Sequence, residues 1–288
     1  EGKCYVDNGK EVILSAGSIG SPQILELSGI GDGKAAEECG LKWVHQLDGV
    51  GKNLQDHLQI RMQYKVKNTV TLNNLLNSVP GKIKMGLEYL FFRRGPLTMP
   101  PSQLGAFARS DSSRLSANIE WHVQPLSLDK FGDPLHSFPA ITPSVCNLRP
   151  SSRGYIQTIS SNPLRHPKIK LNYLSTEDDK QVAVNSIKLT RRIMQSESLQ
   201  SFQPEEFRPG KEVQSEEQLI NAAGDLGSTI FHPVGTCKMG SDKMAVVNDR
   251  LQVRGIDKLR VIDASVMPTI TSGNTNAPTM MIAEKGAE

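Results

Sequence analysis

The stretch GSIGSPQILELSGIG, residues 17–31, decides how this chain is interpreted. It follows an apolar run at residues 9–17, bounded by turn residues, which predicts a buried strand. Within the stretch, residues 21–28 predict a short helix that has Pro22 in its first turn and is ended by Gly29. A strand followed closely by a helix is the element order of an α/β fold.

The glycines of this stretch give weak signals when taken alone. Gly29 and Gly31 form a Gly-x-Gly that follows a helix and lacks a third glycine, whereas a dinucleotide loop follows a strand. Local reasoning therefore favours a helix C-terminus followed by a turn. Ala16 stands where the nucleophile elbow of serine hydrolases needs glycine, so a serine hydrolase is not supported. No Gly-x-x-x-x-Gly-Lys-Ser/Thr motif occurs, so no P-loop is predicted.

Composition excludes several classes of partner. The 288 residues include 33 Lys and Arg against 30 Asp and Glu, a net charge of +3, which is too small to predict binding to nucleic acid. No apolar run approaches the roughly 20 residues that span a bilayer, so no membrane span is predicted. The four cysteines lie far apart in the sequence, which argues against a zinc knuckle or a dense disulfide framework. No metal site is predicted.

The remaining pattern changes along the chain from alternating strands and helices to a mixed middle. We expect an α/β part at both ends and an α+β middle in which helices back an antiparallel sheet. The elements behind this expectation are strands at 41–45, 117–123, 154–159 and 259–263, and helices at 72–92, 178–195, 215–223 and from Pro278 onward.

Longer motifs show a resemblance to a known family. Residues 17–31 resemble the second signature of the glucose-methanol-choline (GMC) oxidoreductases, flavin enzymes that oxidise alcohols. Residues 49–57 resemble the family's segment that closes over the flavin, and residues 231–240 resemble its catalytic-histidine segment. Residues 261–268 and 272–278 resemble its closing strand, loop and helix. The amino-acid sequence of the last motif is most similar to that of insect members of the glucose dehydrogenase type.

The resemblance implies a function and a domain plan. It implies FAD as cofactor and oxidation of the CH–OH group of an alcohol or sugar, with hydride passing to flavin N5. A quinone-like acceptor or dioxygen would then reoxidise the flavin. The similarity of the last motif to insect members favours a dehydrogenase over an oxidase. Residues 1–60 and 226–288 would be parts of a Rossmann-like FAD-binding domain. This domain would be interrupted by a substrate-binding domain at 61–225.

One departure from the family pattern matters for these expectations. The family opens with a strand and a Gly-x-Gly-x-x-Gly turn that holds the FAD pyrophosphate, and the sequence contains no such motif. We therefore expect the chain to be the C-terminal half of a longer protein. A non-catalytic, truncated relative that acts by binding alone stays open as the alternative. The identity of the alcohol, the oligomeric state and the compartment are also open, although the resemblance to insect members is compatible with secretion.

Two residues are predicted to carry the chemistry. Alcohol oxidation needs a base for the hydroxyl proton, and a neutral imidazole suits that task. His232 matches the family's catalytic position and is predicted to be this base. Its partner in the family is a second histidine or an asparagine, and the matching residue here is Asn274. The amide of Asn274 can donate a hydrogen bond to the substrate oxygen but cannot act as a base.

The resemblance also assigns residues to the cofactor. Asp263 is implied to contact the diphosphate and ribityl groups, with capping of the next turn as the alternative. Asn276 is expected to cap the terminal helix with Pro278 in its first turn, so that the positive end of the helix dipole faces the flavin pyrimidine. The complete predicted set is Ala16, Gly17, Asn53, Asp263, Ala264, Asn276 and Pro278.

Three other residues leave alternatives open. Cys237 lies five residues after His232, which permits a thiol hydrolase, but the family match favours a buried structural cysteine. His57 is treated as an ordinary histidine, although it lies in the segment that resembles the flavin cover. Trp121 faces either a substrate pocket or the protein core.

Overall fold

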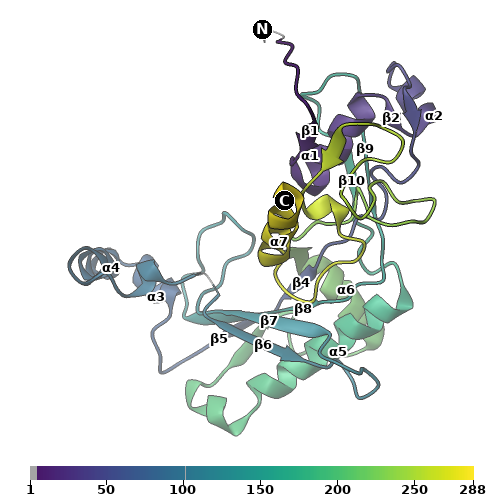
Figure 1. The fold of residues 1–288 in the computed structure, drawn as a ribbon. Helices are drawn as coiled ribbons and strands as arrows, with labels where there is room; N and C mark the ends of the chain where they lie inside the picture. The colour runs from purple at the N-terminus through teal and green to yellow at the C-terminus, as the bar shows by residue number, and fades with distance from the viewer. Residues whose placement is uncertain (1–4, 101) are drawn as a thin grey trace. The chain divides into compact units, whose positions relative to one another are not determined.

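A computed structural model describes residues 5–100 and 102–288 of the chain (Figure 1). The chain forms two compact units, each assembled from separate segments. The first unit comprises Glu1–His57, Pro150–Ser175 and Phe231–Glu288, and the second comprises Leu58–Arg149 and Thr176–Ile230. Residues 150–175 thus group with the two ends of the chain, although the sequence prediction put them in the middle domain.

The first unit is built on two parallel strands from distant parts of the sequence. Strand β1 (Val12–Leu14) pairs in parallel with β13 (Leu259–Val261), and helices follow both strands. These are α1 (Gly17–Leu27), after β1, and α7 (Asn276–Ala287), which β13 reaches through the 3-10 turn η3 (Ala264–Val266). The purple and yellow segments of Figure 1 show this pairing of early and late sequence. The arrangement is the parallel strand-helix pattern expected for an α/β part.

Helix α1 begins four residues earlier than the sequence suggested, which places Pro22 inside the helix. A proline there removes the N–H that would bond to the carbonyl four residues earlier, which belongs to Ser18. The Thr236 hydroxyl supplies the missing donor, with its Oγ1 2.6 Å from the Ser18 carbonyl oxygen. The helix therefore continues through Pro22 because a distant side chain satisfies the freed carbonyl.

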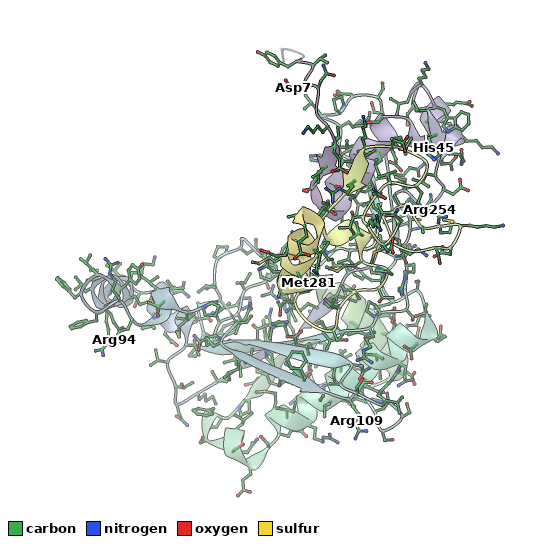
Figure 2. The ribbon with its side chains drawn as sticks, viewed as in Figure 1. Asp7, His45, Arg94, Arg109, Arg254 and Met281 are labelled. Carbon is green, nitrogen blue, oxygen red and sulfur yellow. The ribbon has the colours of Figure 1, made fainter. Side chains whose placement is uncertain are left out.

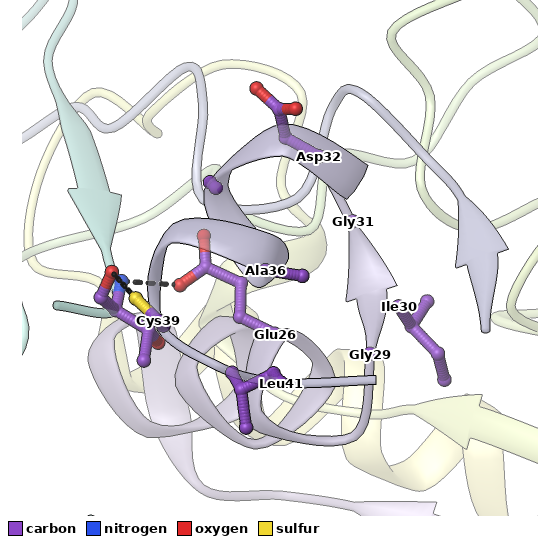
Figure 3. Close-up of a pocket in the computed structure, with 10 residues that line it drawn as sticks. Glu26, Gly29, Ile30, Gly31, Asp32, Ala36, Cys39 and Leu41 are labelled. Carbon is purple, nitrogen blue, oxygen red and sulfur yellow. Dashed lines mark hydrogen bonds between the residues drawn. The ribbon is translucent and has the colours of Figure 1, made fainter. Parts of the chain in front are cut away.

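The end of α1 confirms the local interpretation of Gly29. Its φ is +77, and its N–H bonds to the Glu26 carbonyl, as in a helix C-terminus. A Cβ at this position would lie 2.1 Å from the Lys42 carbonyl oxygen, so the close approach of two backbones requires glycine. Figure 3 shows this corner, where the Glu26 carboxylate accepts the Thr158 N–H at 2.6 Å.

Two short strand pairs complete the first unit. The strand predicted at 41–45 is only β3 (His45–Gln46), which pairs in parallel with β2 (Ile30–Gly31), and helix α2 (Gly33–Glu38) lies between them in sequence. Figure 2 shows the labelled residue His45 near Arg254, whose carbonyl oxygen lies 3.0 Å from the His45 Nε2. The strand predicted at 154–159 is β9 (Tyr155–Gln157), paired with β10 (Lys168–Lys170).

The strands predicted at 117–123 and 154–159 belong to different antiparallel sheets. Residues 117–123 correspond to β7 (Ile119–Gln124), which lies in the second unit, whereas β9 lies in the first. Alternation of apolar and polar residues predicts a strand, but it shows neither which strand it pairs with nor, as the buried Glu120 and Trp121 of β7 illustrate, that one face is exposed.

The second unit is an antiparallel seven-stranded sheet packed against helices. Its central strand, β8 (Ala140–Asn147), pairs with β7 on one edge and with β4 and β5 on the other. The remaining strands extend the sheet through these neighbours. Their bounds are β4 (Leu58–Arg61), β5 (Gln63–Lys65), β6 (Leu104–Ala108), β11 (Glu205–Arg208) and β12 (Gly227–Thr229).

Helices α5 (Glu177–Met194) and α6 (Glu216–Leu226) confirm the two helices expected after the sheet. Acidic residues begin α5 and arginines end it, which complements the helix dipole. The Trp121 side chain of β7 is buried, and its Nε1 donates to Thr190 Oγ1 of α5 at 2.8 Å. Trp121 therefore belongs to the core between sheet and helix.

The single helix predicted at 72–92 is two helices, α3 (Leu72–Leu76) and α4 (Val79–Phe92). Ser78 separates them, because its hydroxyl accepts the Gly81 N–H at 3.1 Å and caps α4. Two 3-10 turns, η1 (Pro96–Thr98) and η2 (Glu197–Phe202), complete the unit. Among the residues that the structure describes, no helix combines the length and the apolar character needed to cross a membrane.

Candidate active site

The segment that carries His232 is held in place by the segment that ends at His57. Gln55 and Val234 form an antiparallel bridge, with N···O distances of 3.0 and 2.9 Å. His57 lies two residues after Gln55, and His232 lies two residues before Val234. The two segments are far apart in sequence but form a single backbone framework in the first unit.

Asp56 fixes the backbone at His232. Its Oδ1 accepts the His232 backbone N–H at 2.9 Å, and its Oδ2 accepts the Tyr173 hydroxyl. Phe231, just before His232, has a φ of +64, which is uncommon for an aromatic residue. Asp56 is 3% exposed, so its contacts lie in a desolvated environment where hydrogen bonds to a charged group are strong. The backbone therefore holds His232 in a well-defined position.

The imidazoles of His57 and His232 contact each other directly. Their Nδ1 atoms lie 3.1 Å apart, and the rings meet edge to face with centroids 5.3 Å apart. His57 is fully buried and His232 is 8% exposed. The sequence prediction missed His57 as a partner, although it identified the segment that carries it.

Asn274 approaches the other side of the His232 ring. Its Nδ2 lies 3.3 Å from His232 Nε2, and its own side chain is exposed. The preceding residue, Gly273, has a φ of +142, a conformation that glycine adopts readily. The structure thus brings together the two predicted catalytic residues, His232 and Asn274.

The chemistry of an amide gives this three-residue chain a direction. An amide nitrogen donates hydrogen bonds and cannot accept them, so His232 Nε2 accepts from Asn274. A neutral His232 then carries its proton on Nδ1, and this N–H donates a hydrogen bond to His57 Nδ1. Donation runs from Asn274 through His232 to His57, and the lone pair on His232 Nε2 points toward the exposed amide.

Asp263 holds together the predicted cofactor residues at the start of α1. Its Oδ2 accepts the Gly17 N–H at 2.9 Å and the Ser21 hydroxyl at 2.6 Å. Its Oδ1 accepts the Ser265 N–H at 2.8 Å, which is the turn-capping role considered as an alternative. Ser21 Oγ also accepts the Ala16 N–H at 3.1 Å. The Asp263 carboxylate therefore positions the helix start and the following turn.

Asn53 has a similar positioning role. Its Nδ2 donates to the carbonyl oxygens of Gly235 at 3.1 Å and Pro268 at 3.2 Å, while its Oδ1 accepts from Arg153 Nε at 3.1 Å. The Ala264 carbonyl accepts the Gly235 N–H at 3.4 Å. Asn53 and Ala264 thus both support the loop that follows His232.

The terminal helix α7 begins one residue from where the sequence placed its cap. Thr275 is the N-cap, so the expectation that Asn276 caps the helix is wrong, and Asn276 is the first helical residue. The Thr275 carbonyl accepts the Thr279 N–H at 3.1 Å. Pro278 lies in the first turn as expected, where it costs no hydrogen bond. The first turn of this 12-residue helix carries the partial positive charge of the dipole.

Cys237 is not suited to nucleophilic catalysis. Its side chain is fully buried, and this burial raises the pKa of the thiol far above its ordinary value. A nucleophilic cysteine needs a lowered pKa and an accessible sulfur. The burial fits the structural cysteine that the sequence favoured over a thiol hydrolase.

Comparison with family models gives two matches to this chain. Both models describe a GMC oxidoreductase, the N-terminal model matching residues 1–59 and the C-terminal model matching residues 150–283. Together they cover about two thirds of the chain, including all the residues of the candidate site.

Curated relatives are similar over nearly the whole chain. An oxygen-dependent choline dehydrogenase of Proteus mirabilis is 43% identical over 99% of this chain and 51% of its own length. An alcohol dehydrogenase (acceptor) of Pseudomonas putida is 40% identical over 96% of this chain and 50% of its own length. The chain therefore spans about half the length of the curated relatives it matches.

Solved structures show the same fold. A formate oxidase of Aspergillus oryzae matches 96% of this chain and 53% of its own chain, with a TM-score of 0.89 and 26% identity. The pyridoxine 4-oxidase of Mesorbium loti matches 96% of this chain and 50% of its own, with a TM-score of 0.82 and 26% identity.

Proposed function

Because the chain belongs to the GMC oxidoreductase family, we propose that the protein oxidises the CH–OH group of an alcohol or sugar, with FAD as its cofactor. Two relatives named as dehydrogenases of choline and of alcohol support this reaction class. The observation that carries the proposal is the contact of His232 with both Asn274 and His57 in the first unit.

The first unit has backbone features that fit a large planar cofactor. At Gly17 and Gly273, φ is +78 and +142, and no described heavy atom lies within 4 Å of the place where a Cβ would stand. The positive end of α7, at Asn276 to Pro278, would favour the electron-rich edge of a flavin. Ala16 and Gly17 would contribute backbone groups, and Asp263, Ala264 and Asn53 would hold that backbone in place. FAD, when bound, supplies the hydride acceptor.

The site residues then divide the work on the substrate. The alcohol oxygen would lie against both side chains, accepting from the Asn274 amide in place of His232 Nε2 and donating its proton to that nitrogen. Asn274 orients the oxygen, since a positioned donor restricts the reactive geometry. His232 is the catalytic base, because the lone pair on its Nε2 can accept the hydroxyl proton.

His57 prepares His232 for this step. By accepting a hydrogen bond from the Nδ1–H, His57 keeps the proton of neutral His232 on Nδ1 and leaves the Nε2 lone pair for the alcohol. When His232 takes up the substrate proton, it becomes an imidazolium whose Nδ1–H remains bonded to His57. His57 is therefore a positioning residue in the proposed mechanism.

A spectroscopic experiment tests the proposal. The intact protein should be yellow and should bleach under anaerobic conditions when an alcohol substrate is added. Reoxidation by dioxygen or by a quinone analogue then identifies the acceptor class. A folded but colourless protein would overturn the proposal of a flavoenzyme. It would support the alternative of a relative that acts by binding alone.

A further inference from the structure

Helix α4 of the second unit has an apolar side that is exposed. Four large apolar residues follow one another at spacings of three or four, so they lie along one side of the helix. They are Val79, Ile83, Leu87 and Leu90, each between 49% and 70% exposed. The opposite side packs against α3, because a Cβ on Gly81 would lie 2.3 Å from the Leu75 carbonyl oxygen. Figure 1 shows α4 extending away from the sheet.

Apolar exposure continues past the end of this helix. Four more large apolar residues, each between 41% and 69% exposed, are Phe91, Phe92, Leu97 and Met99. The side chains of Ile83, Leu87 and Phe91 line one groove of about 640 Å³, so the exposed residues form a continuous area. We call these eight residues the α4 surface. An exposed apolar cluster of this kind marks an interaction site.

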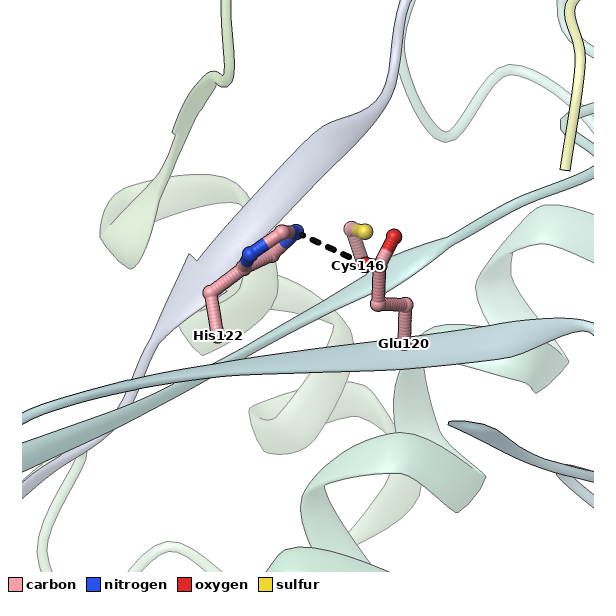
Figure 4. A group of neighbouring side chains, drawn as sticks. All are labelled: Glu120, His122 and Cys146. Atoms are coloured by element: carbon pink, nitrogen blue, oxygen red, sulfur yellow. Dashed lines mark ion pairs between the residues drawn. The ribbon is translucent and has the colours of Figure 1, made fainter. Parts of the chain in front are cut away.

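The sheet of the same unit shows the opposite arrangement. It encloses polar side chains, as Figure 4 shows for Glu120, His122 and Cys146. Glu120 is only 3% exposed, although it carries a carboxylate. A unit that encloses even a carboxylate is large enough to enclose apolar side chains. The exposure on α4 is therefore a property of this helix and not of a loosely packed unit.

Basic residues border the α4 surface on both sides. Successive residues turn about 100° around a helix axis, which places Lys82 on one border and Lys84 on the other. Arg93 and Arg94 follow at the end of the helix. The one acidic residue of the segment, Glu88, lies 3.9 Å from Arg94 Nε. Residues 79–99 thus carry a net charge of +3, equal to that of the whole 288-residue chain.

The combination of exposed apolar side chains and basic residues favours one kind of partner. A second copy of the chain would bring two basic segments together, and they would repel each other. A nucleic acid would neutralise the basic residues but would leave the apolar side chains in water. A membrane with anionic phospholipid suits both, since acyl chains surround the apolar side chains while phosphate groups meet the basic ones. Lysine suits the borders, because its aliphatic stem lies along the apolar layer while its ammonium group reaches the phosphates.

We propose that the α4 surface attaches the protein to membranes that contain anionic phospholipid, with α4 lying in the plane of the interface. The 14 residues of α4 extend about 21 Å, which is shorter than the hydrocarbon core of about 30 Å, so the helix lies on the membrane and does not cross it. The proposal concerns where the protein is held and does not depend on the reaction proposed above.

Sedimentation with vesicles tests the proposal on the intact protein. One set of vesicles is phosphatidylcholine alone, and the other contains phosphatidylserine as a quarter of its lipid. We expect binding to the anionic vesicles to be at least about tenfold tighter. Raising the ionic strength from about 0.1 M to about 1 M should release much of it, because the Debye length falls from about 10 Å to about 3 Å. No binding to the anionic vesicles, or equal binding to both sets, would overturn the proposal.

Paired substitutions separate the two contributions to binding. Lys82→Gln with Lys84→Gln removes two charges and should weaken binding to the anionic vesicles at least about tenfold. Leu87→Ser with Phe91→Ser removes apolar area and should weaken binding at low and at high ionic strength. Binding that survives both pairs of substitutions would place the membrane contact elsewhere and contradict the proposal.

Matched controls change exposed residues elsewhere in the second unit. Lys188→Gln on α5 and Leu115→Ser should bind vesicles as the wild type does. Weakening of the same size in these controls would show that binding follows total charge and apolar area and not the α4 surface, which contradicts the proposal. Circular dichroism and a thermal melt establish that each variant is folded.

Fluorescence gives a local readout of the contact. Phe91→Trp adds an indole to the α4 surface, and its emission should shift to the blue when anionic vesicles are added. The wild type, which contains only Trp43 and Trp121, should shift less. A dimer seen by light scattering that Leu87→Ser dissociates, together with no vesicle binding, would show that a second copy covers α4 in place of a membrane.

Discussion

His57 and His232 are 175 residues apart in sequence, yet their Nδ1 atoms lie 3.1 Å apart in the first unit. Because His232 Nε2 accepts from the Asn274 amide, this contact determines which His232 nitrogen carries the proton. The proposed base therefore has its tautomer set before any substrate arrives. A carboxylate plays this role for histidine in other catalytic sites, and here a second imidazole occupies the place.

We expect His232→Ala to lower the rate of flavin reduction by about 10²- to 10⁴-fold, because the hydroxyl proton then has no base. Bound flavin should remain, since the cofactor residues are unchanged. Anaerobic stopped-flow absorbance measures the rate, and the visible spectrum measures flavin content. The control His166→Ala, at an exposed histidine, should react like the wild type. Unchanged reduction in His232→Ala would refute its role as base.

His57→Leu should lower kcat by about two orders of magnitude with little change in KM, because His232 then loses the acceptor that fixes its tautomer. His57→Gln offers a carbonyl acceptor at a similar distance and should recover part of the loss. The comparison separates positioning from packing, since both variants fill the buried space. Equal activity of the two variants would mean that His57 acts only through packing.

Replacing Asn274 tests the direction of the hydrogen bond. Asn274→Asp should lose more activity than Asn274→Ala, because a carboxylate next to His232 favours the protonated imidazole, which cannot accept a proton. Asn274→His restores an N–H donor and should retain most of the activity. Steady-state kinetics on the three variants checks this order, and an Asp variant as active as the wild type would contradict it.

Glu26 gives a stability prediction that depends on pH. Burial raises the pKa of its carboxyl above the ordinary value of 4.5, although a hydrogen bond from Thr158 opposes this. The folded protein therefore binds the Glu26 proton more tightly than the unfolded chain, so this group stabilises the fold below pH 4.5 and loses that contribution as pH rises through the folded pKa.

The corresponding experiment is a thermal melt of Glu26→Gln across pH. The neutral amide avoids the cost of the buried charge, so Tm should rise relative to the wild type at neutral pH, and the difference should shrink in acid. Glu38→Gln, at an exposed glutamate, is the matched control. A Tm gain of equal size at acidic and neutral pH would exclude titration of Glu26 as the cause.

The cysteines should differ in reactivity. Burial raises the pKa of both the Cys237 and Cys39 thiols, but Cys237 is fully buried whereas Cys39 is half-buried. Iodoacetamide should therefore modify Cys39 well before Cys237 in the folded protein, as peptide mass spectrometry can measure. Denaturant should remove the difference. Rapid labelling of Cys237 in the folded protein would support the hypothesis of a thiol hydrolase.

The sequence predicted the parts of the site that lie in single motifs. His232 and Asn274 were found because each lies in a segment that resembles a catalytic motif, and the structure places them in contact. His57 was missed as a partner because its contact with His232 depends on the bridge between Gln55 and Val234. Pairing between distant segments leaves no periodic signal in either one.

Two helix boundaries differ from the prediction for separate reasons. Pro22 predicted a helix start, but the Thr236 hydroxyl satisfies the carbonyl that the proline frees, so α1 begins earlier. The break between α3 and α4 at Ser78 was missed because apolar residues continue on both sides of it. Local propensity is overridden at Pro22 by a hydrogen bond from outside the expected helix, and at Ser78 by a capping hydrogen bond within it.

The parallel pairing of β1 with β13 has a consequence for biosynthesis. A nascent chain that ends before Leu259–Val261 lacks the β13 partner of β1, although it already contains both His57 and His232. The sheet and helices of the second unit are translated entirely before β13, so they can pack while the first unit is still open. The parallel pair at the base of the first unit is therefore completed late, and a chain that stalls before β13 has a formed sheet in the second unit but an incomplete first unit.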